Sequence, residues 1–226
     1  MPPLSTLPYP SEPSADSRVL VIVNDPRLRR SETLAQHAFF ADYFFGRIPT
    51  KRSELAKYDL ARAIYAYVGE LTSYGYRASE LLVTNLCNAH LPHAPKGRVV
   101  LIPIEQARDG LAEVKKLLQK ARVEVIFAMS EQVNYWLHAL HFCVPRSDFL
   151  QRAEPKARGL DSRAPYYEPK IPKAFQQIAF RRHDTEAGIP LYPTVHVRSW
   201  PFRGPFLKAY GRLYADCISE LKSDGA

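Results

Sequence analysis

The chain has 226 residues, a formal net charge of +8 and a sequence isoelectric point near 9.4. Hydrophobic residues make up 46% of it and charged residues 24%, which is the balance of an ordinary globular domain. No apolar stretch approaches the roughly 20 residues of a membrane-spanning helix, and the first residues lack the basic and apolar regions of a secretory signal, so we expect a cytoplasmic protein without a membrane partner.

The Pro- and Ser-rich residues 1–17 are predicted to form a loose arm, and residues 18–226 a single domain. Cys87, Cys143 and Cys217 are widely separated, and the chain contains no C-x-x-C pair. This spacing excludes the usual zinc finger and four-cysteine iron–sulfur sites. We therefore expect each cysteine to be a small buried apolar residue in a reducing compartment.

Short apolar runs alternate with helical patterns along the chain. A buried strand is predicted at 19–23, followed by helices at 31–45 and 53–74, the second one stopped by Gly75. A second strand follows at 81–85, a short extended piece at 99–102 and an amphipathic helix at 105–121. A third strand at 123–128 leads into a helix capped by Ser130, and a fourth strand at 191–197 precedes a closing helix at 206–221.

Strands that alternate with helices predict an α/β fold with a parallel sheet covered on both faces. Polar residues follow the strands at Asn24 and Asp25, Asn85, Ser130 and His196. Because the carboxyl ends of parallel strands share one edge, where ligands bind, we expect these side chains to line a common site. Taken singly, Asp25 is more typical of an Asp-Pro turn than of a catalyst, and His196 is more typical of a hydrogen-bonded structural histidine.

A basic, loop-rich excursion is predicted at about residues 145–185. Between residues 151 and 182 it carries eight Lys or Arg against three Asp or Glu, together with several Pro and Tyr. This composition suits a nucleic-acid backbone and exposed bases, although a solvated surface loop has the same composition. No P-loop, G-x-G-x-x-G or G-x-S-x-G motif is present. Cys87, His90 and His93 have metal-like spacing but lack a fourth ligand, so no metal site is predicted.

Four of these segments together resemble the uracil-DNA glycosylase superfamily. Residues 21–27, Val-Ile-Val-Asn-Asp-Pro-Arg, resemble the water-activating motif that ends in Gly-Gln-Asp-Pro-Tyr. Residues 82–85 resemble the strand that ends in a base-reading asparagine, and residues 125–137 the next strand and helix. Residues 193–199, Pro-Thr-Val-His-Val-Arg-Ser, resemble the closing motif that carries His-Pro-Ser. The resemblance implies a three-layer α/β/α sandwich with a central four-stranded parallel sheet.

The resemblance also implies hydrolysis of the N-glycosidic bond of uracil or another damaged base flipped out of DNA. Asp25 would stabilise the cationic sugar and position water, and His196 would donate a hydrogen bond to the oxygen of the leaving base. Asn24 and Asn85 would bind the base, Asn85 by offering both a donor and an acceptor to its edge. No metal or organic cofactor is implied.

Phe39 or Phe40 would stack on the flipped base, although both are equally suited to a core. Trp200 and Phe202 would fill the space that the base vacates. The implied DNA-binding residues are Arg27, Arg198, Ser199, Trp200 and Phe202. Arg27 stands where the best-known branch has the tyrosine that excludes thymine, and Val197 and Arg198 replace Pro and Ser, so another lesion or lost catalysis is compatible with the sequence.

The predicted function is therefore that of a monomeric DNA base-excision glycosylase acting on single- or double-stranded DNA. Two alternatives remain open: a non-catalytic nucleic-acid-binding module of the same fold, and an unrelated α/β enzyme that acts on a small anionic metabolite.

Overall fold

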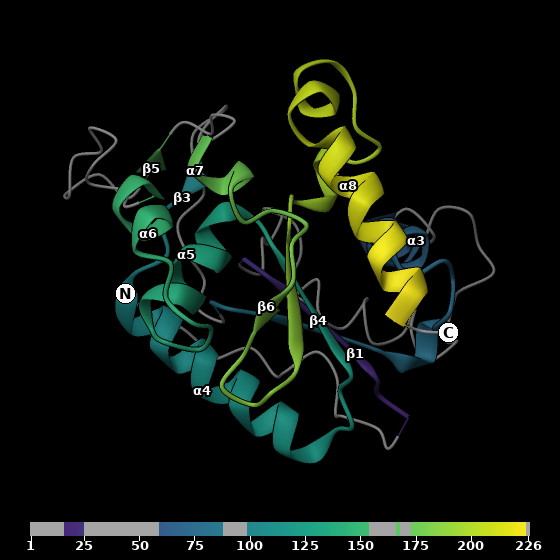
Figure 1. Ribbon diagram of the computed structural model, residues 1–226. Helices are drawn as coiled ribbons and strands as arrows, with labels where there is room; N and C mark the ends of the chain where they lie inside the picture. Colours follow the sequence, from purple (N-terminus) through teal and green to yellow (C-terminus); the bar gives the residue numbers. More distant parts are fainter. Residues whose placement is uncertain (1–15, 25–58, 88–98, 154–165, 168–172, 225–226) are drawn as a thin grey trace.

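A computed structural model of the chain describes residues 16–24, 59–87, 99–153, 166–167 and 173–224 (Figure 1). Its centre is a five-stranded sheet with the order β2-β1-β4-β7-β6. The strands are β1 (Val19–Val23), β2 (Leu81–Asn85), β4 (Val125–Met129), β6 (His183–Asp184) and β7 (Pro190–Thr194). The four longer strands are the four predicted from the sequence, and they pair in parallel as expected.

The prediction of a four-stranded sheet is wrong in one respect, because β6 adds a fifth strand antiparallel to β7. It pairs His183 with Leu191 and Asp184 with Pro190. The turn between the two strands is closed by the Thr185 side chain, whose hydroxyl donates to the Ile189 carbonyl at 2.8 Å. The hairpin widens the sheet by one short strand beyond β7, and two residue pairs join that strand to β7.

Six helices are present in the described part of the chain: α3 (Asp59–Leu71), α4 (Ile104–Lys120), α5 (Glu131–Ala139), α6 (Ser147–Ala153), α7 (Lys173–Gln176) and α8 (Gly204–Asp224). They confirm the predicted helices near 105–121, after Ser130 and near 206–221. The predicted helix at 53–74 is confirmed over α3, and its first six residues, like the predicted helix at 31–45, lie outside the described residues. The extended piece at 99–102 is β3 (Val99–Val100), which pairs with β5 (Tyr166–Tyr167) in a separate small sheet.

The end of α3 differs from the prediction that Gly75 stops it. The left-handed backbone falls on Ser73 and Tyr74, with φ of 54° and 58°. The Tyr74 ring folds back over Gly69, where an added Cβ would lie 2.5 Å from the ring. The glycine needed by this turn is therefore Gly69, inside the helix, because it makes room for the returning tyrosine.

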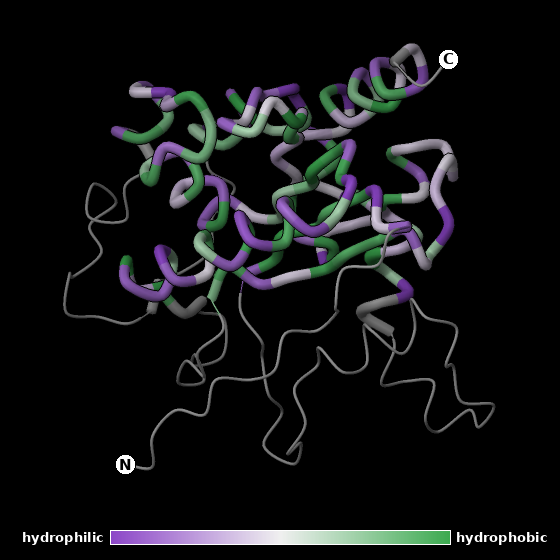
Figure 2. Tube along the Cα trace, turned by 90° about the horizontal axis from the view of Figure 1, so that it is seen from below, coloured by the Kyte–Doolittle hydropathy of each residue, from purple (hydrophilic) through white to green (hydrophobic). Residues whose placement is uncertain are grey.

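Helices cover both faces of the sheet, which makes the sheet the middle of three layers (Figure 1). The odd-numbered residues of β1 face α3 and α8, where Tyr67, Tyr210 and Tyr214 are buried. Leu20 and Ile22 face α4 and α5. The hydrophobic residues accordingly gather along the strands and on the helix sides that face them (Figure 2). No helix in the described residues is long and apolar enough to cross a membrane.

The described part of the excursion expected at 145–185 contains helices and residues of the hydrophobic core. Residues 154–165 and 168–172 of it lie outside the described residues. The remainder contains α6 and α7, and Phe175, Ile178 and Phe180 are buried against α8 and the sheet. The prediction of a loop is therefore wrong for residues 173–180, because three apolar side chains anchor that stretch. All three cysteines are buried, as predicted, and none of them forms a disulfide.

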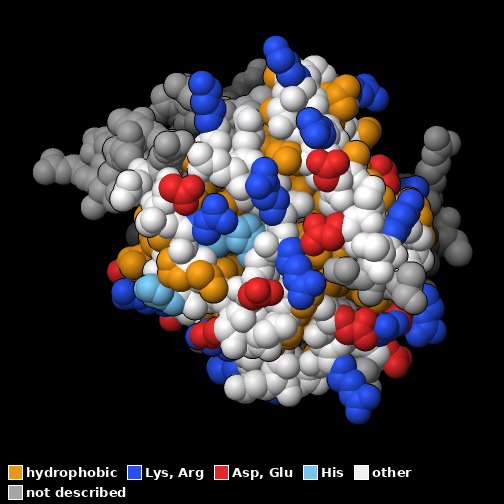
Figure 3. All heavy atoms as spheres, in the orientation of Figure 1, with side chains coloured by type: hydrophobic (Ala, Val, Ile, Leu, Met, Phe, Trp, Pro, Cys, Tyr) orange, Lys and Arg blue, Asp and Glu red, His pale blue; other side chains and the backbone are white. Residues whose placement is uncertain are grey.

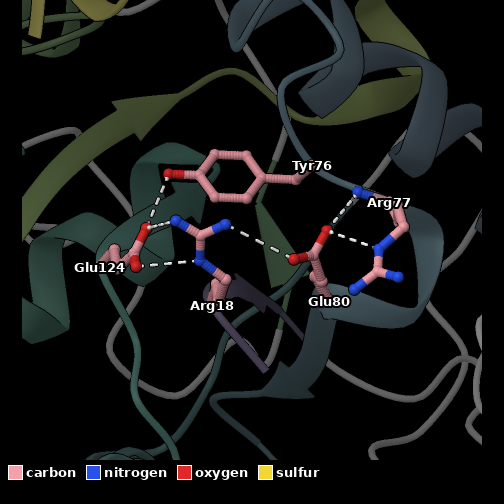
Figure 4. A network of polar contacts seen from close by, with 5 residues as sticks. All are labelled: Arg18, Tyr76, Arg77, Glu80 and Glu124. Atoms are coloured by element: carbon pink, nitrogen blue, oxygen red, sulfur yellow. Dashed lines mark hydrogen bonds and ion pairs between the residues drawn. The ribbon is translucent and has the colours of Figure 1, made fainter. Parts of the chain in front are cut away.

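A polar clamp, formed by Arg18, Tyr76, Glu80 and Glu124, ties together the amino ends of β1, β2 and β4 (Figure 4). The Arg18 guanidinium donates to both carboxylate oxygens of Glu124, at 2.9 and 2.8 Å, and lies 3.5 Å from Glu80. The Tyr76 hydroxyl donates to Glu124 at 3.2 Å. Glu80 is buried, and a hydrogen bond from the Arg77 backbone N–H, followed by one from the Arg77 side chain, lowers the pKa of its carboxyl group.

Replacing Arg18 with Met is expected to lower the free energy of unfolding by about 1–2 kcal/mol, because the buried Glu80 carboxylate loses a counter-charge. Chemical denaturation would measure the loss. Arg212→Met is the matched control: that side chain is 94% exposed and pairs with Asp216 on the same helix, so the change should stay within about 0.5 kcal/mol. Equal effects of both substitutions would show that the clamp does not stabilise the strand ends.

Buried His138 of α5 packs against half-buried His183 of β6. The His138 and His183 rings meet edge to face, with centroids 5.2 Å apart, and His138 Nδ1 lies 3.1 Å from the Val144 carbonyl oxygen. Burial, with a smaller contribution from the charge of His183 and then Arg146, lowers the pKa of His138 to about 4. Burial also lowers the pKa of His183. The charges of Arg146 and Arg181 add to this lowering, and the charge of Asp184 opposes it.

This pair predicts a loss of stability in acid. The unfolded chain binds a proton at each histidine near pH 6.5, whereas folded His138 resists protonation until about pH 4. The free energy of unfolding should therefore be constant with respect to this group above about pH 6.5 and fall by about 3 kcal/mol as the pH approaches 4. Denaturation curves across that range should be flatter for His138→Asn, which keeps a donor near the Val144 carbonyl but does not titrate. An identical pH dependence in the variant would contradict the assignment.

Candidate functional site

The carboxyl ends of β1, β2, β4 and β7 lie at one edge of the sheet, which we call the carboxyl edge. Val23 is level with Asn85, and Met129 is level with Thr194. Backbone hydrogen bonds continue past the strands: Cys87 N–H donates to the Asn24 carbonyl at 2.9 Å, and Ser130 N–H to the Thr194 carbonyl at 2.7 Å. The predicted convergence of four strand ends at one edge is therefore present.

Two of the predicted polar residues are in direct contact at this edge. The Ser130 hydroxyl donates to Asn24 Oδ1, across 106 positions of sequence. The same hydroxyl accepts from the Val133 N–H at 3.4 Å, which confirms Ser130 as the N-cap of α5. Asn24 is 8% exposed and Asn85, the last residue of β2, is 2% exposed. Both amides therefore stand at the border between the core and the edge.

His196 lies two residues beyond β7 and is half-buried. It caps η4 (Val197–Ser199), a 3-10 helix of one turn, and its Nδ1 accepts from the Arg198 N–H at 3.2 Å. A neutral imidazole that accepts at Nδ1 carries its proton on Nε2. The hydrogen bond from the Arg198 N–H therefore favours the tautomer of His196 that carries its proton on Nε2.

The structure does not favour the predicted wedge role of Trp200 and Phe202. The Trp200 ring lies 5.6 Å from the Tyr67 ring, and the Phe202 ring 5.2 Å from that of Tyr214. Both side chains are packed against the core between α3 and α8. In this conformation they hold the segment after His196 onto the domain, so insertion into a base stack would require both contacts to break.

The exposed groups beside His196 lie elsewhere in the same segment. Leu207, in the first turn of α8, is 56% exposed, and Arg198, Arg203 and Lys208 of the same segment are exposed too. Residues 187–215 contain four Lys or Arg and no Asp or Glu. Figure 3 shows basic side chains at the upper end of the molecule, where the chain passes from β7 into α8. Sequence reasoning missed Arg203, Leu207 and Lys208, although this long gap between acidic residues was a readable signal.

The remaining predicted residues lie partly outside the described structure. Asp25, Arg27, Phe39 and Phe40 are outside the described residues, as are His90 and His93. Ser199, the last residue of η4, is half-buried. Within the described residues, no group of three or more His, Cys, Asp or Glu is placed to hold a metal ion.

A cleft of about 780 Å³ lies at the opposite, amino edge of the sheet, next to the clamp. Arg18, Tyr76 and Glu124 line it, together with Arg182 and the end of α8 at Lys222. The Glu124 carboxylate is engaged there by Arg18 and Tyr76, and Arg182 lies 3.7 Å from Asp184. The charges of Arg18, Glu124 and Arg182 are thus matched within the protein, and the candidate site remains the carboxyl edge.

Comparison with known proteins adds no family assignment: no protein-family model and no curated protein matches the chain.

Trp200→Ala is expected to destabilise the fold by about 2–3 kcal/mol, because it removes a large ring packed on Tyr67. Leu207→Ala, made as the control in the same segment, should change stability by no more than about 0.5 kcal/mol. Thermal and chemical unfolding would measure both. A Trp200→Ala protein as stable as the wild type would restore the wedge assignment.

Proposed function

We propose that this protein is a DNA N-glycosylase of the uracil-DNA glycosylase type, which hydrolyses the glycosidic bond of uracil or another damaged base. The observation that supports the proposal best is the shared edge of β2, β1, β4 and β7, where Asn24, Ser130 and His196 lie although the sequence separates them widely. The four parallel strands would be the glycosylase core, and β6 an addition to it.

The tautomer of His196 suits the chemistry. Cleavage of the bond places positive charge on the sugar and negative charge on an oxygen of the departing base. A donor fixed near that oxygen stabilises the transition state more than the substrate. The Nε2–H of His196, held in place by the bond from Arg198 N–H to Nδ1, is such a donor. Asp25 supplies the carboxylate that stabilises the sugar and orients the attacking water.

The surface beside this edge suits DNA. Arg198, Arg203 and Lys208 are exposed in the segment that follows His196, and their positive charge attracts phosphates and releases counterions on binding. Among the described residues, the groups at the edge itself include the amides of Asn24 and Asn85, the Ser130 hydroxyl and the His196 imidazole, which read a base by hydrogen bonds. Exposed Leu207 offers an apolar contact to the base stack.

The proposal predicts that the wild-type protein forms abasic sites in a uracil-containing oligonucleotide, and that Asp25→Asn lowers the rate at least about 100-fold. His196→Gln should lower it by a similar factor, since one oxyanion donor contributes about 10²–10³ to the rate. Cleavage of the abasic product, followed on a denaturing gel, measures both. Asp184→Asn is the matched control, because that carboxylate is exposed on β6, and it should leave the rate unchanged.

The same oligonucleotide separates the alternatives. Salt-dependent binding of wild-type protein without any abasic product would favour a non-catalytic nucleic-acid-binding module. No binding, or binding that does not weaken between about 50 and 200 mM salt, would favour an enzyme for a small anionic metabolite. Product formation that survives Asp25→Asn unchanged would refute the assigned chemistry.

A further inference from the structure

Gly110 is buried in the middle of α4. Glycine inside a helix is less favourable than alanine, because it loses more backbone freedom on folding. The structure gives a reason for a glycine here. A Cβ at position 110 would overlap the carbonyl oxygen of Leu86 and lie 2.5 Å from its carbonyl carbon, whereas real Cβ atoms keep at least 3.0 Å from such neighbours. Both neighbours are backbone atoms, so no side-chain rotation relieves the overlap, and only a glycine lets α4 lie this close to Leu86.

The segment that α4 touches links two side chains of the candidate site. Leu86 and Cys87 are buried, and they follow Asn85, the last residue of β2. Their backbone continues the pairing with β1: the Leu86 N–H donates to the Val23 carbonyl at 2.8 Å, and the Cys87 N–H to the Asn24 carbonyl at 2.9 Å. The segment is therefore joined to Asn85 through the chain and to Asn24 through a hydrogen bond.

We propose that Gly110 is a positioning residue that fixes the places of Asn24 and Asn85 by letting α4 hold the end of β2. The proposal rests on the proposed function, in which these two amides bind the flipped base. An added Cβ would push α4 and the Leu86 carbonyl apart, and the displacement would pass to both amides through the segment just described. A misplacement of about 1 Å can lower a rate about 100-fold, even where the mutation lies outside the site.

The positioning is testable without any activity. In Gly110→Ala, the Cys87 N–H should exchange with water at least about tenfold faster, relative to the slowest amides of the same variant, which report global unfolding. The side-chain NH₂ signals of Asn24 and Asn85, assigned by their disappearance in Asn24→Asp and Asn85→Asp, should shift. Leu117→Ala is the matched control, because Leu117 is buried in the same cluster as Leu86 but lies about 10 Å farther along α4 than Gly110. Equal changes in both variants would overturn the proposal.

Ala107→Val separates α4 from the sheet in a second, milder way. Ala107 is fully buried, and it lies one turn before Gly110 in the same helix. The larger side chain overpacks the interface, so the Cys87 exchange rate and the two Asn signals should change in the same direction as in Gly110→Ala, by a smaller amount. If Gly110→Ala does not fold, Ala107→Val decides the question alone, and unchanged signals and exchange in it would contradict the proposal.

Rates of abasic-site formation separate positioning from a loss of stability. At a temperature where all variants are folded, Gly110→Ala should lower kcat/KM on a uracil-containing oligonucleotide about 100-fold, and Leu117→Ala less than about threefold. In an Asn85→Ala background the effect of Gly110→Ala should be at least about threefold smaller, because one of the amides it positions is gone. Strictly additive effects in an active protein would refute this inference alone. A wild type inactive on uracil would refute the proposed function, and the Cys87 exchange and Asn signals would still decide whether Gly110 positions the amides.

Discussion

The burial of β1 is the constraint on which the rest of the structure depends. This strand is paired on one side with β2 and on the other with β4, and residues 19–22 have no exposed surface. Both of its faces pack against helices, so no polar side chain fits along its length. Polar groups are consequently confined to the two residues that flank it, Arg18 and Asn24. Each of these two residues organises one edge of the sheet.

The two edges meet that constraint with different chemistry. At the amino edge, Arg18 carries a full charge, which Glu80 and Glu124 neutralise in the clamp. These ion pairs hold the amino ends of β1, β2 and β4 together. At the carboxyl edge, Asn24 is neutral and is held by the neutral hydroxyl of Ser130. Charges matched inside the protein stabilise a fold but leave little for a ligand to gain. Neutral amides and hydroxyls retain hydrogen-bonding capacity at low desolvation cost, which suits recognition of an uncharged base.

The sequence was sufficient to predict the elements that satisfy this constraint, because their signals are local. β1 and β2 were placed at their observed bounds from short β-branched runs, and the cap at Ser130 from its position before an apolar helix. β6 was missed because a two-residue edge strand, His183–Asp184, has no apolar pattern of its own. The burial of Phe175 and Phe180 was missed because their neighbours are basic or proline-rich, and the partners that bury them lie on β7 and α8.

The candidate site shows the same division between local and distant information. That His196 and Asn24 reach one edge followed from the alternation of strands and helices, whereas the partner of each side chain did not. Trp200 and Phe202 were predicted to contact DNA because they follow His196. In the structure both rings pack against Tyr67, which lies far earlier in the chain. Their packing gives the segment after His196 a rigid base, and it leaves Arg198, Arg203 and Leu207 facing outward. The aromatic residues of this segment thus pack on the core. Its exposed basic and aliphatic residues form the surface that would contact a nucleic acid under the proposed function.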